Sequence, residues 1–260
     1  MPELPEVESF RRYISNTCLH KTIDGVRVSD DRILGDLQEV ELRSALLERR
    51  FDKARRHGKY LGLLTGERAL VLHFGMSGFP RYYKRGSPHH ARLILDFRSG
   101  YHLALSCQRL FCRLHLADSL EAFVQAKGLG VDALSGSLGQ GKFMEIMSSH
   151  RGKLKPALMD QSLVAGIGNI YSDEILFQAR LPPTVRLEDL DRDDLKEVYR
   201  RMKEVLRTAV DGNARFDELP GDYIVPHRHG DGKCPVCGRP LESVKVSGRT
   251  AIYCPRCQGW

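Results

Sequence analysis

Apolar residues recur at helical spacing near the start of the chain. Val7, Phe10 and Ile14 lie three or four positions apart, which predicts an amphipathic helix from about Pro5 to Asn16. Short segments of β character follow this helix and are bounded by turn residues. These segments are residues 22–28, 39–47, 60–65, 69–74, 91–97 and 101–106. Strands at such intervals predict an antiparallel sandwich or barrel rather than alternating strands and helices.

The pattern becomes helical after Asp118. Helices are expected at residues 120–127, 142–149, 155–161, 169–178 and 192–210, and the last has one apolar stripe against a charged back. A Gly- and Ser-rich stretch at residues 134–141 is typical of a linker. The sequence therefore predicts an α+β fold of two domains. An antiparallel β-sandwich with flanking helices would span residues 1–133, a helical C-terminal domain residues 142–226, and its final segment residues 227–260.

The charge balance favours a polyanionic partner. The 260 residues carry 40 Lys and Arg against 33 Asp and Glu, a net charge of +7. Six of the basic residues lie between Arg49 and Lys59, against the single Asp52. Such a run is usually a solvated face, but here it leads into an apolar segment, so a strand could hold Lys59 rigidly toward a phosphate. Without an apolar stretch of membrane length or a signal sequence, we expect no membrane and a cytoplasmic or otherwise intracellular protein.

Four of the seven cysteines form two Cys-x-x-Cys pairs near the end of the chain. The pairs are separated by sixteen residues, a spacing that can present four thiolates tetrahedrally to zinc. Because four sulfur ligands leave no open position, one structural zinc ion is expected, held by Cys234, Cys237, Cys254 and Cys257. Residues 241–246 and 249–253 alternate like two strands of a hairpin, with Ser247-Gly248 at its turn. The other three cysteines are scattered, as expected in a reducing compartment.

The chain begins Met1-Pro2-Glu3-Leu4-Pro5-Glu6. Removal of the initiator methionine would leave Pro2 with a free secondary amine, and an α-amino group titrates near pH ~8. Such an amine is a nucleophile that condenses with a carbonyl or sugar carbon to an iminium, and Glu3 is a candidate proton carrier beside it. The alternative is an ordinary polar start to a helix, in which Glu6 favours the helix dipole.

The start of the chain, Pro2-Glu3-Leu4-Pro5-Glu6-Val7-Glu8, resembles the N-terminus of the formamidopyrimidine-DNA glycosylase and endonuclease VIII family of DNA repair enzymes. Three further segments match in the family's order, and Leu4 favours the formamidopyrimidine branch. The resemblance implies a base-excision enzyme that is both a glycosylase and an abasic-site lyase. Residues 1–133 would then be the catalytic domain, 142–226 a helix-two-turn-helix DNA-binding domain, and 227–260 the zinc finger.

The second matching segment contains Lys155 and Gly166-Ile167-Gly168-Asn169. Two glycines before a helix permit close backbone approach to an anion, although simple capping is a competing account. The resemblance implies that Lys155 and Asn169 hold the DNA backbone and that Glu174 buttresses the catalytic terminus. In the zinc hairpin, it implies that Arg249 contacts phosphates; an ordinary exposed arginine is the alternative.

The third segment, His73-Phe74-Gly75-Met76-Ser77-Gly78, would project Met76 from a turn. The resemblance implies that Met76 fills the gap left by an extruded nucleotide, with Arg109 facing the orphaned base and Phe111 acting as a wedge. The loop departs from the family pattern, which has Asp-Pro before the arginine pair and Gly after the phenylalanine, where this chain has Cys107-Gln108 and Cys112. The stretch from 211 to 233 is also shorter than the lesion-covering loop of enzymes that excise oxidised guanine.

The expected partner is damaged DNA in duplex form, bound by Lys59, Lys155, Asn169 and Arg249, and a monomer suits such a clamp. Pro2 attacks C1′ of the damaged nucleotide, Glu3 assists sugar opening with Glu6 in a supporting position, and β,δ-elimination follows. The substrates would be formamidopyrimidines, with 8-oxoguanine, hydantoins or oxidised pyrimidines as alternatives. Two other functions fit part of the pattern: a non-catalytic binder of damaged or structured nucleic acid, and an RNA-associated protein with the same helical motif.

Overall fold

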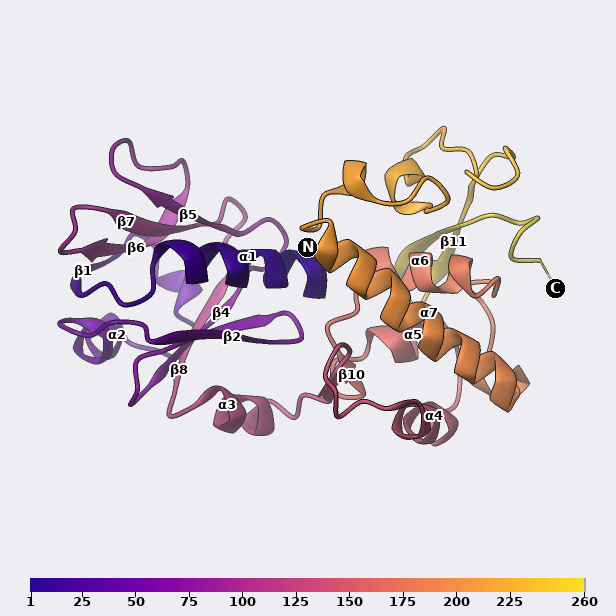
Figure 1. Cartoon of the computed structure of the whole chain (residues 1–260), viewed down its shortest axis with the longest axis horizontal. Coiled ribbons are helices and arrows are strands. Elements are labelled where there is room, and N and C mark those ends of the chain that lie inside the picture. The colour runs from indigo at the N-terminus through magenta and orange to yellow at the C-terminus, as the bar shows by residue number, and fades with distance from the viewer. Residues whose placement is uncertain (260) are drawn as a thin grey trace. The chain divides into compact units, whose positions relative to one another are not determined.

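In the computed structural model, which describes residues 1–259, the chain folds into two units, one ending at Gly128 and the next beginning at Leu129 (Figure 1). The first unit contains two four-stranded antiparallel sheets. One has the order β1 (Ile23–Val28), β6 (Ala91–Phe97), β7 (His102–Ser106), β5 (Phe79–Tyr83). The other has the order β2 (Lys53–His57), β3 (Tyr60–Leu64), β4 (Ala69–His73), β8 (Arg113–Ala117). The predicted antiparallel sandwich and the α+β class are confirmed.

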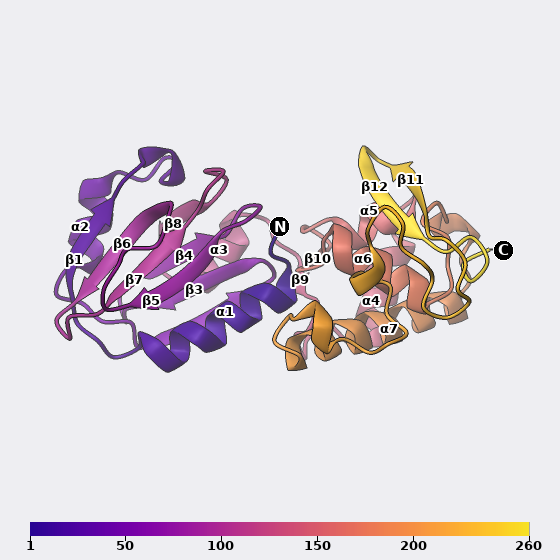
Figure 2. The same ribbon diagram turned by 90° about the horizontal axis from the view of Figure 1, so that it is seen from above.

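Helices cover the open sides of this sandwich. Apolar residues of both sheets share one buried cluster with α1 (Leu4–Thr17), whose Val7 and Ile14 are fully buried. The same helix contacts β2 and β5, the edge strands of the two sheets, while α2 (Glu39–Leu46) contacts the opposite edge strand β1 (Figure 2). Covered edges cannot pair with other chains. Helix α1 therefore closes one side of the sandwich and is fixed along its length.

The prediction of a strand over residues 39–47 is wrong, because this segment forms α2. Leu42 and Leu46 are its buried residues, four positions apart, and Glu41 caps the start of the helix by accepting the N–H of Gln38 at 3.0 Å. Helical spacing and a capping carboxylate thus override the mixed local pattern. Helix α3 (Leu120–Ala126) packs on β2 and β8 near the end of the unit.

The second unit is mainly helical. Its elements are α4 (Gln140–Ser148), α5 (Leu154–Met159), α6 (Asn169–Gln178), α7 (Arg192–Asp211), the parallel pair β9 (Val131–Asp132) and β10 (Val164–Ala165), and the hairpin β11 (Glu242–Val246) and β12 (Arg249–Tyr253). Among the described residues 1–259 there are also four 3-10 turns: η1 (Asp31–Ile33) in the first unit, and η2 (Leu187–Asp189), η3 (Phe216–Glu218) and η4 (Val225–His227) in the second. Helix α6 is the centre of the second unit, because it contacts α5, α7, β12 and η4. None of the helices formed by residues 1–259 is long and apolar enough to span a bilayer.

The stretch 134–141 is not a linker but part of the second unit. Leu138 is 1% exposed, and its carbonyl oxygen accepts from the Tyr199 hydroxyl at 2.9 Å. The Lys203 ammonium donates to the carbonyl of Ser135 at 3.2 Å. Both donors belong to α7, so side chains from this long helix hold the Gly- and Ser-rich segment in place. The division between the units falls at residues 128 and 129 instead.

Candidate active site and nucleic-acid interface

The start of α1 holds Glu3 in one conformation next to Pro2. Glu3 is the N-cap of the helix and forms a reciprocal capping box with Glu6, whose carboxylate accepts the Glu3 backbone N–H at 2.8 Å. Pro5 occupies the first turn, where its missing N–H costs nothing. The Glu3 side chain is 2% exposed. The sequence thus places a buried carboxylate one residue from the predicted nucleophile, whose nitrogen is reactive only once Met1 has been removed.

Lys59 is held in a tight turn between two strands. His57 pairs with Tyr60, so Gly58 and Lys59 are the two central residues of the β2–β3 hairpin, and Gly58 has a φ of +55°. A glycine with positive φ at the first central position is the pattern of a type II′ turn. Lys59 is only 6% exposed. The expected rigid placement of this lysine is therefore a property of the turn as well as of the strand.

Arg56 ties this turn to α1 and was missed by the sequence analysis. Its guanidinium donates to the Glu8 carboxylate on α1 at 3.2 Å and to the Gly58 carbonyl at 3.2 Å, and its side chain is 9% exposed. Burial of Glu8 raises the pKa of its carboxyl, but the hydrogen bonds and charges of Arg11 and Arg56 outweigh burial, so the pKa lies below its usual value. Arg56 had appeared only as one member of a charge run, whereas it connects the two elements that carry Glu3 and Lys59.

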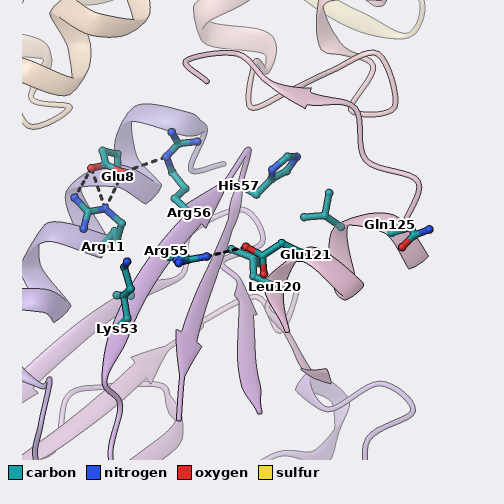
Figure 3. Close-up of a pocket in the computed structure, with 11 residues that line it drawn as sticks. Glu8, Arg11, Lys53, Arg55, Arg56, His57, Leu120, Glu121 and Gln125 are labelled. Carbon is teal, nitrogen blue, oxygen red and sulfur yellow. Dashed lines mark hydrogen bonds and ion pairs between the residues drawn. The ribbon is translucent and has the colours of Figure 1, made fainter. Parts of the chain in front are cut away.

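A pocket of about 640 Å³ lies beside this connection, between the side of α1, β2 and α3 (Figure 3). Glu8, Arg11 and Arg56 form its upper ion-pair cluster, and Arg55 pairs with Glu121 at 2.8 Å across it. Two carboxylates, Glu8 and Glu121, face the four basic residues Arg11, Lys53, Arg55 and Arg56, so the lining keeps a net positive charge. Neither Pro2 nor Glu3 lines it. The predicted chemistry belongs to the start of α1, not to this pocket.

Met76 and Phe111 project from neighbouring loops of the first unit. The two residues are 46% and 52% exposed, and Arg109, two positions before Phe111, is exposed as well. A Cβ on Gly75, which has a φ of +58°, would come within 2.4 Å of the Phe111 backbone. The absence of a side chain at Gly75 therefore lets the two loops touch. Met76 and Phe111 thus lie on loops that pack against each other at Gly75, and Arg109 belongs to the same loop as Phe111.

The scattered arrangement expected for Cys107 and Cys112 is wrong, because the structure pairs them as a disulfide with their Cα atoms 6.2 Å apart. The two residues enclose the loop that carries Arg109 and Phe111. A separation of five in sequence carries no specific signal of pairing, and the expectation of a reducing compartment pointed away from it. Cys18 is a buried free thiol.

The four knuckle cysteines lie together in the second unit. Their sulfur atoms are all within 4.8 Å of one another, with 3.7 Å between Cys234 and Cys257 and 3.5 Å between Cys237 and Cys254. Zinc–sulfur bonds of about 2.3 Å in a tetrahedron place the sulfurs about 3.8 Å apart, so the arrangement fits one zinc ion. The ion would join the two ends of the β11–β12 hairpin and leave no position for a substrate. Ser247 and Gly248, both with positive φ, form the predicted turn.

A buried carboxylate, Asp173, organises the nucleic-acid candidates of the second unit. It is 1% exposed and accepts hydrogen bonds from Lys155 on α5 at 2.6 Å, from the backbone N–H of Ile252 on β12 at 3.1 Å, and from Arg228 after η4. Three separate elements are therefore attached to one side chain of α6. The sequence analysis gave Asp173 no role, because a single acidic residue in a helix carries no sign of burial.

Lys155 differs from the expected direct phosphate contact. Its side chain is 1% exposed, and its ammonium donates to Asp173, to the Ser172 hydroxyl at 2.7 Å and to the Asn169 carbonyl at 3.3 Å. It therefore holds the first turn of α6 from inside. The Asn169 amide donates to the carbonyl of Thr250 on the zinc hairpin at 3.0 Å, which joins the helix start to the strand that begins with the exposed Arg249.

Glu174 is fully buried and holds η4 against α6. Its carboxylate accepts from the Val225 backbone N–H at 2.8 Å and from the Gln178 amide at 2.9 Å. Burial raises the pKa of this carboxyl to about 7, although these donors lower it. The expected support of the catalytic terminus by Glu174 stays a prediction. Within its own unit, the residue fixes the segment that follows η3, where a lesion-covering loop would be anchored.

Comparison with known proteins decides the family. Family models match three successive parts of the chain: the formamidopyrimidine-DNA glycosylase N-terminal domain at residues 1–114, its H2TH domain at 129–217, and the zinc finger found in FPG and IleRS at 232–259. The formamidopyrimidine-DNA glycosylase of Pelotomaculum thermopropionicum is 31% identical over 99% of both chains, and that of Thermus thermophilus is 37% identical over 100% of this chain and 99% of its own. The chain belongs to the formamidopyrimidine-DNA glycosylase family.

Solved structures of this glycosylase family have the same fold. The Lactococcus lactis formamidopyrimidine-DNA glycosylase bound non-covalently to DNA with an abasic site has a TM-score of 0.88 at 27% identity, over 99% of this chain and 100% of its own. The same enzyme in complex with DNA containing N7-benzyl-Fapy-dG also has a TM-score of 0.88 at 27% identity, over 100% of both chains. The H2TH match begins at residue 129, where the second unit begins.

We expect His73 to make the stability of the first unit of this glycosylase depend on pH. Its Nδ1 accepts the Gly75 N–H at 3.3 Å, which requires a neutral ring, and burial, followed by the charges of Lys59, His115, Arg113 and Lys127, lowers its pKa to about 4. The unfolded chain takes up this proton near pH 6.5, so stability is lost as the pH falls from 6.5 to 4, by up to about 3 kcal/mol. His73→Asn keeps an acceptor without this titration and should flatten that part of the curve. Urea unfolding at a series of pH values would measure it, and parallel curves for the two proteins would contradict the assignment.

Asp173→Asn should destabilise the second unit strongly. The change removes the negative charge beside Lys155, and breaking a buried ion pair on one side costs about 3–5 kcal/mol. The matched control is Asp193→Asn, in which the ion pair to Lys196 has a carboxylate side chain 83% exposed, so the loss should stay within about 0.5 kcal/mol. Urea unfolding followed by circular dichroism compares the two variants. An equal, small loss in both would show that Asp173 does not organise the unit.

Proposed function

We propose that this protein is a base-excision repair glycosylase with abasic-site lyase activity, and that the imino group of Pro2 is its nucleophile once Met1 is removed. Membership of the formamidopyrimidine-DNA glycosylase family supports the activity. The observation that carries the assignment of roles is the cap of α1, which holds a buried Glu3 carboxylate directly after Pro2. Because its substrate is DNA, we expect the protein to act within the cell.

The reaction divides one difficult displacement into easier covalent steps. The Pro2 nitrogen attacks C1′ of the damaged nucleotide while a proton delivered by Glu3 to the sugar ring oxygen opens the ring, and the base leaves. The resulting iminium acidifies the 2′ proton. When the 2′ proton is lost, the 3′ phosphate is eliminated, and a second elimination releases the 5′ phosphate. Glu6 maintains the Glu3 backbone, and Lys59, fixed by its turn, provides a positive charge for a phosphate.

Duplex DNA is the partner for which the exposed loops are suited. Met76 and Phe111 would fill the stack vacated by an extruded nucleotide, and Arg109 would face the base left behind, offsetting an unstacking cost of a few kcal/mol. Asn169 and Arg249 would contact phosphates, which add affinity without sequence preference. In this scheme Lys155 acts indirectly, by holding Asn169 through its carbonyl.

For the lesion, we propose ring-opened purines, with hydantoins and oxidised pyrimidines as further substrates. The support is the short segment between α7 and the zinc finger, which forms η3 and η4 and is anchored by Glu174. Phe216 is the exposed aromatic of this segment, at 40%. A short segment encloses less of an extruded base than a long loop does, so it selects less strictly among oxidised bases.

Glu3→Gln tests the division of roles. Glutamine preserves a capping oxygen but cannot deliver a proton, so excision of a formamidopyrimidine from duplex DNA should fall by roughly 100- to 10,000-fold. An abasic sugar is already in equilibrium with its open aldehyde, and borohydride trapping on abasic DNA should stay within about tenfold of wild type. Glu67→Gln, whose carboxylate side chain is 69% exposed in its ion pair with Arg49, is the control for altered charge. Equal loss of excision and trapping in Glu3→Gln would contradict the proton-delivery role, and the absence of trapping in wild type would indicate a non-catalytic binder.

A further inference from the structure

Cys107 and Cys112 form a disulfide, called here the clamp, at the base of the exposed loop 108–111. Their Cα atoms are 6.2 Å apart, within the range that disulfides span. Both residues are buried, at 1% and 0% exposure, whereas Phe111 between them is 52% exposed. The clamp therefore closes the base of the loop without occupying the surface that Arg109 and Phe111 present.

The loop adopts a conformation that needs such a constraint. Leu110 has a φ of +56°, a left-handed conformation that a leucine adopts only at a cost in free energy. The Arg113 guanidinium donates to the carbonyls of Leu110 at 2.9 Å and Cys112 at 2.7 Å, which holds one end of the loop. A covalent bond between residues 107 and 112 removes many of the alternative loop conformations that Leu110 would otherwise favour.

The same cysteine pair reaches the loop that carries Met76. The Cys112 sulfur lies 3.2 Å from the carbonyl oxygen of Phe74, and a Cβ on Gly78 would lie 2.4 Å from that sulfur. The contact leaves no space for a side chain at Gly78. If the Cys112 sulfur moves when its bonding changes, both the turn that carries Met76 and the loop that carries Phe111 must adjust.

We propose that Cys107 and Cys112 are a reversible redox switch that sets the rigidity of the two loops. The proposal rests on the proposed function, in which Met76, Arg109 and Phe111 enter the duplex. With the disulfide closed, the loops are preorganised for insertion. With both thiols reduced, the loop 108–111 must be ordered by DNA itself, and the cost of that ordering weakens binding.

Hydrogen peroxide is the class of oxidant that fits a buried pair, because it is small enough to enter when the exposed loop opens. One thiolate attacks the peroxide oxygen, becomes a sulfenic acid and releases hydroxide. The second thiolate attacks that sulfur, forms the disulfide and releases hydroxide, which takes up a proton. Two thiols and one peroxide give one disulfide and two waters, and a dithiol reductant returns two electrons and two protons. Conditions that oxidise DNA bases would thus also close the loop.

The test compares full-length wild-type protein treated with peroxide or with dithiothreitol, with the state of the pair established by thiol alkylation and mass spectrometry. Fluorescence anisotropy then measures affinity for a duplex containing a tetrahydrofuran abasic analogue and for the same strand alone. We expect the oxidised form to bind the duplex on the order of tenfold more tightly and the single strand equally, since a single strand offers no stack to fill. Equal duplex affinity, or a pair that neither reagent converts, would overturn the proposal.

The double variant Cys107→Ser, Cys112→Ser is the matched control, because it retains all four zinc cysteines. It should bind like reduced wild type after either treatment, and peroxide-dependent tightening in this variant would place the effect elsewhere and overturn the proposal. Borohydride trapping on abasic duplex separates this test from that of the function. Trapping in both redox forms with equal duplex affinity rejects the switch alone, whereas no trapping in either form rejects the proposed function.

Discussion

The hydrogen bonds that begin helix α1 are the constraint on which the proposed chemistry depends. A helix leaves its first N–H groups without partners, and in this chain Glu3 and Glu6 supply the missing acceptors to each other's backbone. The cap fixes the residue next to Pro2, and the helix behind it closes one side of the sandwich. Arg56 then joins the same helix to the turn of Lys59. The position of the proposed reactive end is thus set by the packing of the first unit.

In the second unit, hydrogen bonds to a buried charge fix the elements in place. A carboxylate removed from water is tolerated only when donors surround it, and Asp173 receives them from α5, from β12 and from Arg228. Because α6 carries Asp173 and also begins at Asn169, the predicted phosphate contacts sit on elements tied to one side chain. The zinc site fixes the far ends of the hairpin that carries Arg249. These polar contacts supplement an apolar core in this unit, in which Leu158, Ile175 and Val205 are fully buried.

The sequence predicts what depends on local pattern and misses what depends on contacts distant in sequence. Helix α7 and the hairpin turn at Ser247-Gly248 follow from periodicity and glycine chemistry, and both are found where they were predicted. Strand β2 was missed because four of its five residues are basic and its burial comes from α1 rather than from alternation along the strand. The inward orientation of Arg56, the burial of Lys155 and the pairing of Cys107 with Cys112 also arise from tertiary contacts. A residue type in a one-dimensional pattern does not reveal which charged or sulfur-containing side chain turns inward.

The identity of the atom joined to deoxyribose tests the account most directly. Wild-type protein would be incubated with abasic duplex and borohydride, digested, and analysed by tandem mass spectrometry. The account predicts the reduced sugar remnant on the nitrogen of Pro2, in a peptide that lacks Met1. A remnant on a lysine such as Lys59, or an equal yield of adduct from chains that retain Met1, would contradict it.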